Sequence, residues 1–131
     1  MTTLTNDQKI LLVDDEPDLT TVFSMGLEDS GFKVDAFNDP LLALSEFKKG
    51  SYDLILLDDK MPNMNGFEIY TKIRKIDDKV KICIITAFDI HQEELRKKFQ
   101  LPYDKEDTKL FIQKPIEIDE LVRQIKGELG L

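Results

Sequence analysis

Two short apolar runs that end in aspartates constrain the fold of this chain more than any other feature. Leu54-Ile55-Leu56-Leu57 leads directly into Asp58, and Ile10-Leu11-Leu12-Val13 leads into Asp14 and Asp15. Aliphatic runs without polar alternation are typical of strands that are buried on both faces. The aspartates would then follow the carboxyl ends of two buried strands, where open α/β sheets bind their ligands. Acids at these positions suggest either a cation site or a carboxylate nucleophile.

Strand-like and helix-like segments alternate along the whole chain. The sequence predicts strands at residues 9–14, 32–37, 52–58, 81–86 and 109–113, and the period-two pattern of 32–37 indicates an edge strand. It predicts helices at residues 17–30, 41–49, 67–76, 93–99 and 118–129. Five βα units in succession predict an α/β fold: a flavodoxin-like doubly wound five-stranded parallel sheet, order 2-1-3-4-5, with five helices.

The apolar residues of the first two helices predict their buried faces. The first helix would bury Leu19, Val22, Phe23, Met25 and Leu27. The second would carry Leu41, Leu44 and Phe47 on its apolar side, with Gly50 ending it.

Length and composition indicate a single domain. The chain has 131 residues, and we expect a polar tail at residues 1–8 followed by one domain at residues 9–131. Lys and Arg number 18 against 26 Asp and Glu, which gives a net charge of −8. This balance argues against a direct nucleic-acid partner, because phosphate binding needs clustered basic residues.

The same counts bear on the cellular compartment. Cys83 is the one cysteine of the sequence, so an internal disulfide is excluded and a cytoplasmic, reducing location is expected. No segment approaches the roughly 18 apolar residues that span a bilayer, so no membrane partner is expected. The first eight residues lack the basic and apolar regions of a signal peptide.

The expected strand order brings five reactive side chains to one edge of the sheet. Asp14 and Asp15 follow the first strand, Asp58 the third, Thr86 ends the fourth, and Lys114 follows the fifth. Three neighbouring carboxylates repel one another, and oxygen ligands of this kind favour Mg²⁺. A carboxylate can also act as a nucleophile toward phosphorus. Mg²⁺, the Lys114 ammonium and the Thr86 hydroxyl with a backbone N–H could then each take one phosphoryl oxygen.

Four motifs stand out in the chain. They are Leu12-Val13-Asp14-Asp15-Glu16-Pro17, Leu57-Asp58-Asp59-Lys60-Met61-Pro62-Asn63-Met64-Asn65-Gly66, Ile84-Ile85-Thr86-Ala87 and Gln113-Lys114-Pro115. With these motifs the chain resembles the receiver domain of two-component response regulators over about residues 8–130. Any one of them alone is a weak signal, and together they are very specific. The resemblance implies a domain that takes a phosphoryl group from a histidine kinase or a histidine phosphotransfer protein and then switches a face that binds a downstream protein.

The resemblance also assigns roles to individual residues. It implies that Asp58 is the phosphoacceptor and that Asp15, Asp58 and the backbone carbonyl of Lys60 bind Mg²⁺. Asp14 would act through water or from the second shell of ligands. Thr86 and Lys114 would bind the phosphoryl group, and a cis Lys114–Pro115 bond is usual in the family. Such a domain catalyses only its own phosphorylation and dephosphorylation, so a conventional enzyme is not expected.

Three further positions follow from the resemblance. Phe111 occupies the position of the aromatic switch residue, where Tyr is common. Lys60 and Phe88 occupy positions that tune the lifetime of the phosphoryl group in the family. Asp59 is interpreted as a loop residue, because strand alternation turns it away from Asp58. The chain departs from the family in a longer stretch between Thr86 and Lys114, including residues 99–108, on a face that receivers use for output.

Several other functions compete with this interpretation. A phosphate sink or shuttle would keep the same residues without a protein output. An interaction module with the receiver fold would not be phosphorylated, against which the complete set of acids, Thr86 and Lys114 argues. An aspartyl phosphohydrolase would need an acid two residues after Asp58, where Lys60 stands. A flavin carrier would need a Ser/Thr/Gly-rich loop after the first strand, where the acids would repel a phosphate.

Overall fold

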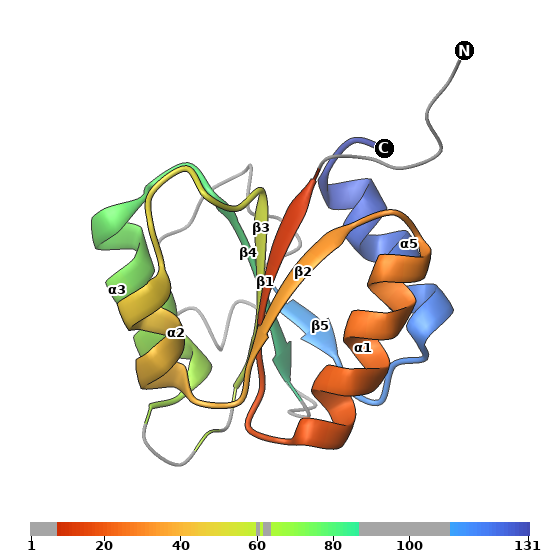
Figure 1. The fold of residues 1–131 in the computed structure, drawn as a ribbon, viewed down its shortest axis with the longest axis horizontal. Coiled ribbons are helices and arrows are strands. Elements are labelled where there is room, and N and C mark those ends of the chain that lie inside the picture. Colours follow the sequence, from red (N-terminus) through yellow and green to blue (C-terminus); the bar gives the residue numbers. More distant parts are fainter. Residues whose placement is uncertain (1–7, 60, 62–63, 87–110) are drawn as a thin grey trace.

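The apolar runs form one parallel sheet. The computed structural model describes residues 8–59, 61, 64–86 and 111–131. Its strands are β1 (Lys9–Val13), β2 (Lys33–Phe37), β3 (Leu54–Asp58), β4 (Lys81–Thr86) and β5 (Phe111–Gln113). They are all parallel and follow the order β2-β1-β3-β4-β5, which confirms the predicted fold class and the edge position of β2 (Figure 1). Val13 pairs with Leu57, so the acids that follow β1 and β3 meet at one edge.

Two pairs of helices cover the two faces of the sheet. α1 (Pro17–Asp29) and α5 (Ile118–Glu128) lie on one face, and α2 (Pro40–Glu46) and α3 (Gly66–Ile76) lie on the other (Figure 1). These are the four helices of the described residues; the predicted helix at 93–99 lies outside them, as do residues 109 and 110 of the predicted fifth strand. None of the described helices has the length and apolar character needed to cross a bilayer.

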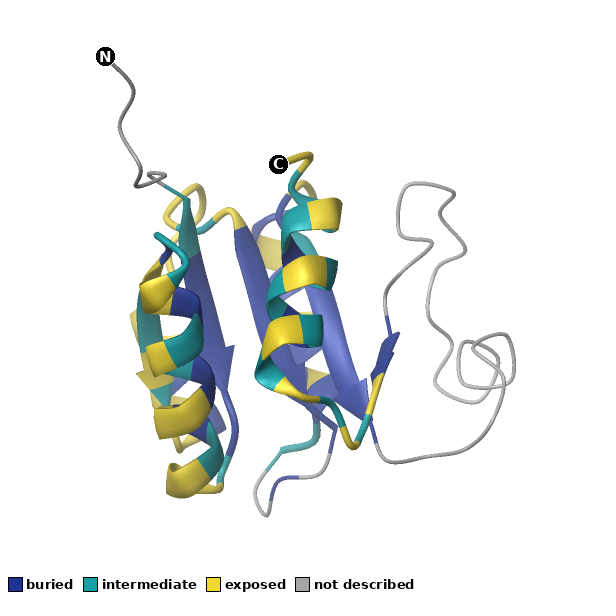
Figure 2. Cartoon of the chain, turned by 90° about the vertical axis from the view of Figure 1, so that its right-hand side faces the viewer, coloured by how far each residue is buried: buried dark blue, intermediate teal, exposed yellow. Residues whose placement is uncertain are grey.

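Strand alternation divides the interior into two cores. Leu12, Leu56 and Ile112 face Phe23 of α1 and Leu121 of α5 in one core, which we call the α1/α5 face. The residues next to these in the strands point the other way, onto α2 and α3. This second core, the α2/α3 face, is built from Val13, Leu57, Ile84, Phe111, Phe67 and Tyr70. Figure 2 shows the strands as mostly buried behind α1 and α5.

The predicted buried face of α1 is correct in part. Phe23 and Leu27 are buried with Thr20, at the spacing of three to four residues that one helical face requires. Val22 and Met25 were expected in the core, and this prediction is wrong, because both are exposed and Val22 retains 52% of its accessible surface. A turn of about 100° per residue carries them away from the sheet.

The second helix is shorter than predicted. It ends at Glu46 and does not reach residue 49, because Phe47 takes an extended backbone conformation. The Phe47 ring is buried and stacks on Tyr52, with 6.1 Å between ring centroids. Leu41, predicted on the apolar side, is exposed. Burying the aromatic ring of Phe47 outweighs another turn of helix, since helices this short gain little from propensity alone.

The start of α3 packs directly behind the end of β3. Asn65 and Glu68 form a capping box, with Asn65 Oδ1 accepting from the Glu68 N–H at 2.9 Å. The Gly66 N–H donates to the Asp59 carbonyl at 3.2 Å. A Cβ atom on Gly66 would lie 2.5 Å from the Asp58 carbonyl oxygen. The absence of a side chain at residue 66 therefore lets α3 support the backbone of Asp58.

We expect Gly66→Ala to lower the free energy of unfolding by roughly 1–3 kcal/mol, since the methyl group can be accommodated only by moving backbone. Gly127→Ala is the matched control. It lies in α5, where the added Cβ would meet no atom within 4 Å apart from its chain neighbours and its own helix backbone, and we expect it to stabilise the protein by about 0.5–1 kcal/mol. Chemical denaturation measures both values. Equal stability of Gly66→Ala and the unsubstituted protein would contradict the close packing.

Candidate functional site

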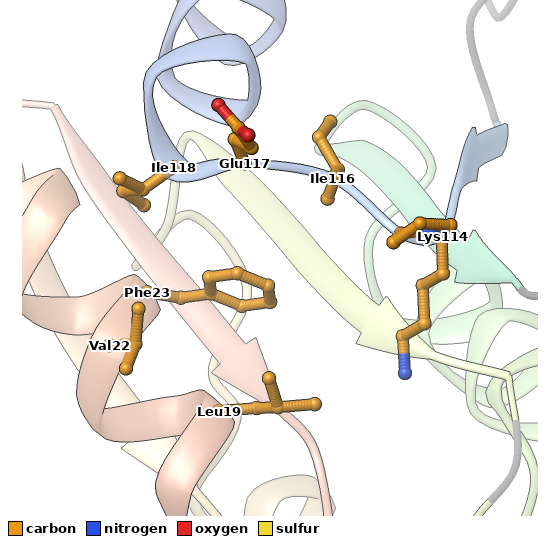
Figure 3. A pocket seen from close by; sticks show the side chains of 8 residues that line it. Leu19, Val22, Phe23, Lys114, Ile116, Glu117 and Ile118 are labelled. Atoms are coloured by element: carbon orange, nitrogen blue, oxygen red, sulfur yellow. The ribbon is translucent and has the colours of Figure 1, made fainter.

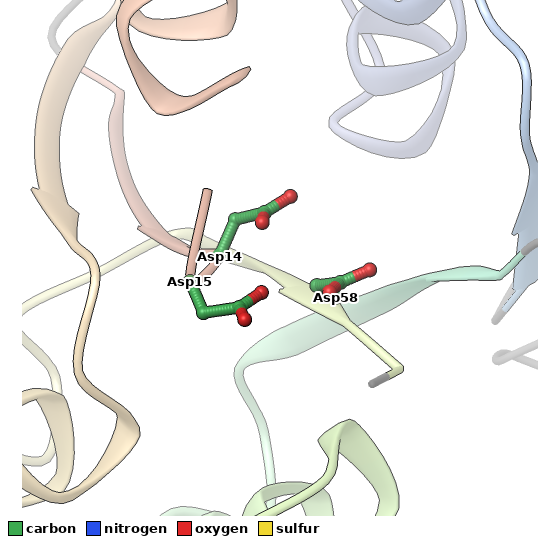
Figure 4. A group of neighbouring side chains, drawn as sticks. All are labelled: Asp14, Asp15 and Asp58. Carbon is green, nitrogen blue, oxygen red and sulfur yellow. The ribbon is translucent and has the colours of Figure 1, made fainter. Parts of the chain in front are cut away.

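The three aspartates predicted to converge do so at the carboxyl edge of the sheet. Asp14, Asp15 and Asp58 each have a carboxylate oxygen within 4.8 Å of the other two (Figure 4). Asp14 and Asp58 are 1% and 4% exposed, and Asp15 is half-buried. Three acids this close, two of them hidden from water, form a site that attracts a cation.

Strand alternation explains which side chains meet. The backbone N–H groups of Asp14 and Lys114 still donate to the neighbouring strand, at 3.1 Å and 2.8 Å, so the sheet continues one residue past β1 and β5. Asp14, Asp58 and Lys114 each come two residues after a member of the α1/α5 face. Side chains two residues apart in a strand point to the same side. The three charged groups therefore emerge together above that core.

Lys114 closes the site opposite the aspartates. Its Nζ atom lies 2.7 Å from Asp58 Oδ1 and 4.0 Å from Asp14 Oδ2, with 21% of the side chain exposed. The Lys114–Pro115 peptide bond is cis, as the resemblance implied. One ammonium thus faces two buried carboxylates.

The pKa values of Asp58 and Lys114 reflect both burial and the neighbouring charges. Burial raises the pKa of the Asp58 carboxyl, although the hydrogen bond and charge of Lys114 act in the opposite direction. Burial by itself would lower the pKa of the Lys114 ammonium, but the hydrogen bond and charge of Asp58, with the charge of Asp14, outweigh burial and raise it. Burial thus dominates the shift in the pKa of Asp58, and the neighbouring carboxylates dominate that of Lys114.

Asp14 has one carboxylate oxygen to spare. Its Oδ1 accepts from the Glu16 N–H at 2.9 Å, at the start of α1. Its Oδ2 is buried, and among the described residues it has no hydrogen-bond partner. Burial is the main reason that the pKa of Asp14 rises from 3.8 to about 6. A buried anionic oxygen that faces two more carboxylates fits a divalent cation or a water bound to one.

Thr86 lies at the carboxyl edge, and its hydroxyl donates a hydrogen bond to Asp59, for which the sequence suggested no role in the site. Thr86 Oγ1 donates to Asp59 Oδ2 at 2.8 Å. Asp59 follows the last residue of β3, as expected of a loop position, but it is 4% exposed and its side chain is engaged. Asp58 pairs with Ile85, so Asp59 and Thr86 are level with each other and on the same side. The pairing depends on the register of β3 with β4, which no local sequence pattern specifies, so the sequence held no signal for it.

The remaining predicted positions divide into one that is described and two that are not. Phe111 is buried on the α2/α3 face and packs against Phe67, with 6.0 Å between ring centroids. It lies at the start of β5, three residues before Lys114, and its switch role stays a prediction. Lys60 and Phe88 lie outside the described residues, and so does the segment 99–108.

An apolar pocket lies beside the charged site. It has a volume of about 840 Å³ and separates α1 from the segment that follows β5 (Figure 3). Leu19, Val22 and Phe23 line it from α1, and Ile116 lines it from the other side. Lys114 belongs to its wall as well as to the aspartate site. Apolar residues of α1, among them the exposed Val22, therefore lie next to the charged groups.

We expect Asp14→Asn to stabilise the metal-free protein at pH 8 by roughly 2–3 kcal/mol, with the gain vanishing below pH 4. The folded-state pKa of Asp14, about 6, lies above its ordinary value of 3.8, so folding becomes less favourable as pH rises through this window. Asparagine keeps an acceptor for the Glu16 N–H and removes the buried charge. Urea denaturation in a chelator, from pH 4 to pH 8, measures the difference. A gain that does not change with pH would contradict this origin.

Comparisons with known proteins agree with this geometry. The sequence profile of the response regulator receiver domain matches residues 10–126. The response regulator ArlR of Staphylococcus saprophyticus is 37% identical over 121 residues, covering 92% of this chain and 52% of that protein. The CpxR homolog of Haemophilus influenzae, a transcriptional regulatory protein, is also 37% identical over 121 residues, covering 92% of this chain and 50% of that protein. This chain thus spans about half the length of these relatives.

A hybrid histidine kinase and two solved structures extend the comparison. Hybrid signal transduction histidine kinase B of Dictyostelium discoideum is 36% identical over 134 residues, covering 94% of this chain and 7% of that protein. A CheY-like receiver domain protein of Methanospirillum hungatei superposes with a TM-score of 0.80 at 25% identity, covering 95% of both chains. The non-phosphorylated HemR receiver domain of Leptospira biflexa does so with a TM-score of 0.80 at 27% identity, covering 95% of this chain and 96% of that one. From its profile, its relatives and its carboxyl-edge aspartates, the chain belongs to the receiver domain family of two-component response regulators.

Proposed function

We propose that Asp58 accepts a phosphoryl group and that the domain thereby switches a face that binds a downstream protein. The observation that carries this proposal is the buried Asp58 carboxylate at the end of β3, 2.7 Å from the Lys114 ammonium and beside two further aspartates. A nucleophilic oxygen, a fixed positive charge and a cation-attracting pair of acids meet within one small site. These are the parts that phosphoryl transfer needs, since it depends mainly on positioning and charge neutralisation.

The proposed reaction makes one bond and breaks one. A carboxylate oxygen of Asp58 attacks the phosphorus of a phosphohistidine, and the new P–O bond replaces the P–N bond. The electron pair of the broken bond stays on the imidazole nitrogen. A phosphohistidine whose other ring nitrogen already carries a proton therefore leaves as a neutral imidazole. The Lys114 ammonium stays within reach of Asp58 and can move to a phosphoryl oxygen as charge develops there.

We propose that Mg²⁺ is the cofactor. Asp15 and Asp58 would bind it directly, and Asp14 would act through a water molecule or by supporting the direct ligands. The family resemblance adds the backbone carbonyl of Lys60. The spare Oδ2 atom of Asp14 and the carboxylate-only donor set support a hard cation. When bound, Mg²⁺ would supply positive charge to one phosphoryl oxygen. Lys114 and Thr86 would bind the other two phosphoryl oxygens.

Receiver domains are phosphorylated by histidine kinases, and we propose a histidine kinase or a histidine phosphotransfer protein as the donor. The apolar pocket beside Lys114 supports a protein donor, because an apolar surface next to the site could hold the donor while its histidine reaches Asp58. We further propose that the domain comprises residues 9–131 and acts in the cytoplasm. It would bind no nucleic acid itself and would have no enzymatic activity beyond its own phosphorylation and dephosphorylation.

The competing functions make different demands on the same residues. An interaction module that is not phosphorylated would not need the partly buried Lys114 next to the buried Asp58, because removing these charges from water costs free energy. A phosphate sink or shuttle would use the same chemistry without an output, and the output segment between residues 87 and 110 lies outside the described part of the chain. Phosphorylation of Asp58 is therefore the step to test first.

We expect Asp58→Asn to abolish phosphorylation, because an amide oxygen is a poor nucleophile and cannot form the acyl phosphate. Intact mass after incubation with Mg²⁺ and a small acyl phosphate measures the gain of one phosphoryl group. Asp59→Asn is the matched control, since it changes the adjacent buried acid and should still be labelled. Full labelling of Asp58→Asn with a native circular dichroism spectrum would contradict the assignment.

We expect Asp15→Ala to weaken Mg²⁺ binding by about tenfold or more, a factor that corresponds to only ~1.4 kcal/mol of lost attraction. Removing one of three carboxylates leaves less charge to hold a strongly hydrated ion. Calorimetric titration with Mg²⁺ measures the affinity. Asp18→Ala, an exposed acid in the first turn of α1, serves as the control for the change in net charge. An unchanged affinity in Asp15→Ala would show that the metal has other ligands.

A further inference from the structure

Asp59 is a buried acid for which the proposed phosphoryl transfer has no use. It is 4% exposed, and its Oδ2 accepts the Thr86 hydroxyl at 2.8 Å. Thr86 itself is 3% exposed. Both side chains continue the α2/α3 face, Asp59 two residues after Leu57 and Thr86 two residues after Ile84. Asp58 and Lys114 continue the opposite face. The hydroxyl is thus bonded on the side of the sheet away from the ion pair.

A threonine hydroxyl has one proton and can donate one full hydrogen bond at a time. In the structure the Thr86 hydroxyl donates this proton in a hydrogen bond to the Asp59 carboxylate. A phosphoryl oxygen on Asp58 needs the same proton if Thr86 is to bind it. The two acceptors therefore compete for one donor, and the phosphorylated state can use Thr86 only after its bond to Asp59 breaks.

We propose that Asp59 is a positioning residue. Its hydrogen bond holds the Thr86 side chain in the unphosphorylated state, and so sets how tightly a phosphoryl group must bind Thr86 to switch the domain. This inference rests on the proposed phosphorylation of Asp58. A hydrogen bond to a buried carboxylate is stronger than one to a neutral acceptor. Releasing Thr86 also deprives the buried Asp59 oxygen of this donor, which adds to the resistance.

The role of Asp59 predicts a specific pattern of variants. The probe is beryllofluoride with Mg²⁺, which mimics the phosphoryl group without a covalent step, and the measurement is its dissociation constant. Asp59→Ala removes the competing acceptor, so beryllofluoride should bind about tenfold more tightly, the size expected for losing one charge-assisted hydrogen bond. Asp59→Asn keeps an acceptor oxygen and removes the charge, so it should gain clearly less.

The charge of Asp59 also acts on Asp58, where, in addition to burial, it helps to raise the pKa of the Asp58 carboxyl. A double-mutant cycle separates the effect of this charge from that of the hydrogen bond. In the background of Thr86→Val, which has the shape of threonine without the hydroxyl, Asp59→Ala should leave the affinity for beryllofluoride unchanged. An equal gain in Asp59→Asn and Asp59→Ala, or a gain that persists with Thr86→Val, would overturn the proposal in favour of simple charge repulsion.

Two controls keep the result interpretable. Circular dichroism and urea denaturation establish that each variant is folded, and if Asp59→Ala fails to fold, Asp59→Leu replaces it in the same cycle because it fills the space without an acceptor. If beryllofluoride does not bind the unsubstituted protein, the proposed function fails. If it binds that protein and Asp59→Ala with equal affinity, the proposed function stands and the role of Asp59 fails.

Discussion

Crowding of negative charge at the carboxyl edge of the sheet is the constraint on which the site depends. The strands that carry Asp14 and Asp58 fix the positions of these acids, because the residues just before them are packed in the interior of the protein. Lys114, which follows β5 and is 56 residues from Asp58 in the sequence, offsets part of this charge. Desolvation makes the uncompensated remainder unfavourable, which is the physical reason why a cation should be attracted.

The groups proposed to react and the groups proposed to position them lie on opposite faces of the sheet. Asp58 and Lys114 stand above the α1/α5 face, next to the apolar pocket. Asp59, Thr86 and the buried Phe111 belong to the α2/α3 face, against α3. Under the proposed function, a change at Asp58 would reach the second face through Thr86, whose hydroxyl donates to Asp59 on that face. The sheet therefore separates the reacting groups from the group that would report their state.

Much of the site could be predicted because buried parallel strands leave few choices. The apolar runs before Asp14 and Asp58 identify the strands, and the strand order then brings their ends together. The exposure of Val22 could not be predicted, because an apolar residue on α1 does not reveal which way the helix faces. The bond between Asp59 and Thr86 depends on the register of β3 with β4, which no local pattern encodes. Roles for Lys60 and Phe88 remain predictions.

The adjacent acids Asp58 and Asp59 have a consequence for protein engineering. Because neighbouring residues of a strand point to opposite sides, deleting a residue early in β3 would carry Asp59 into the place of Asp58 and move each core residue after the deletion to the wrong layer. A carboxylate would still stand beside Lys114, yet Thr86 would lose its partner and the interior its packing. Insertions and deletions in a chimera of this domain therefore belong in its loops, and strand length must be preserved.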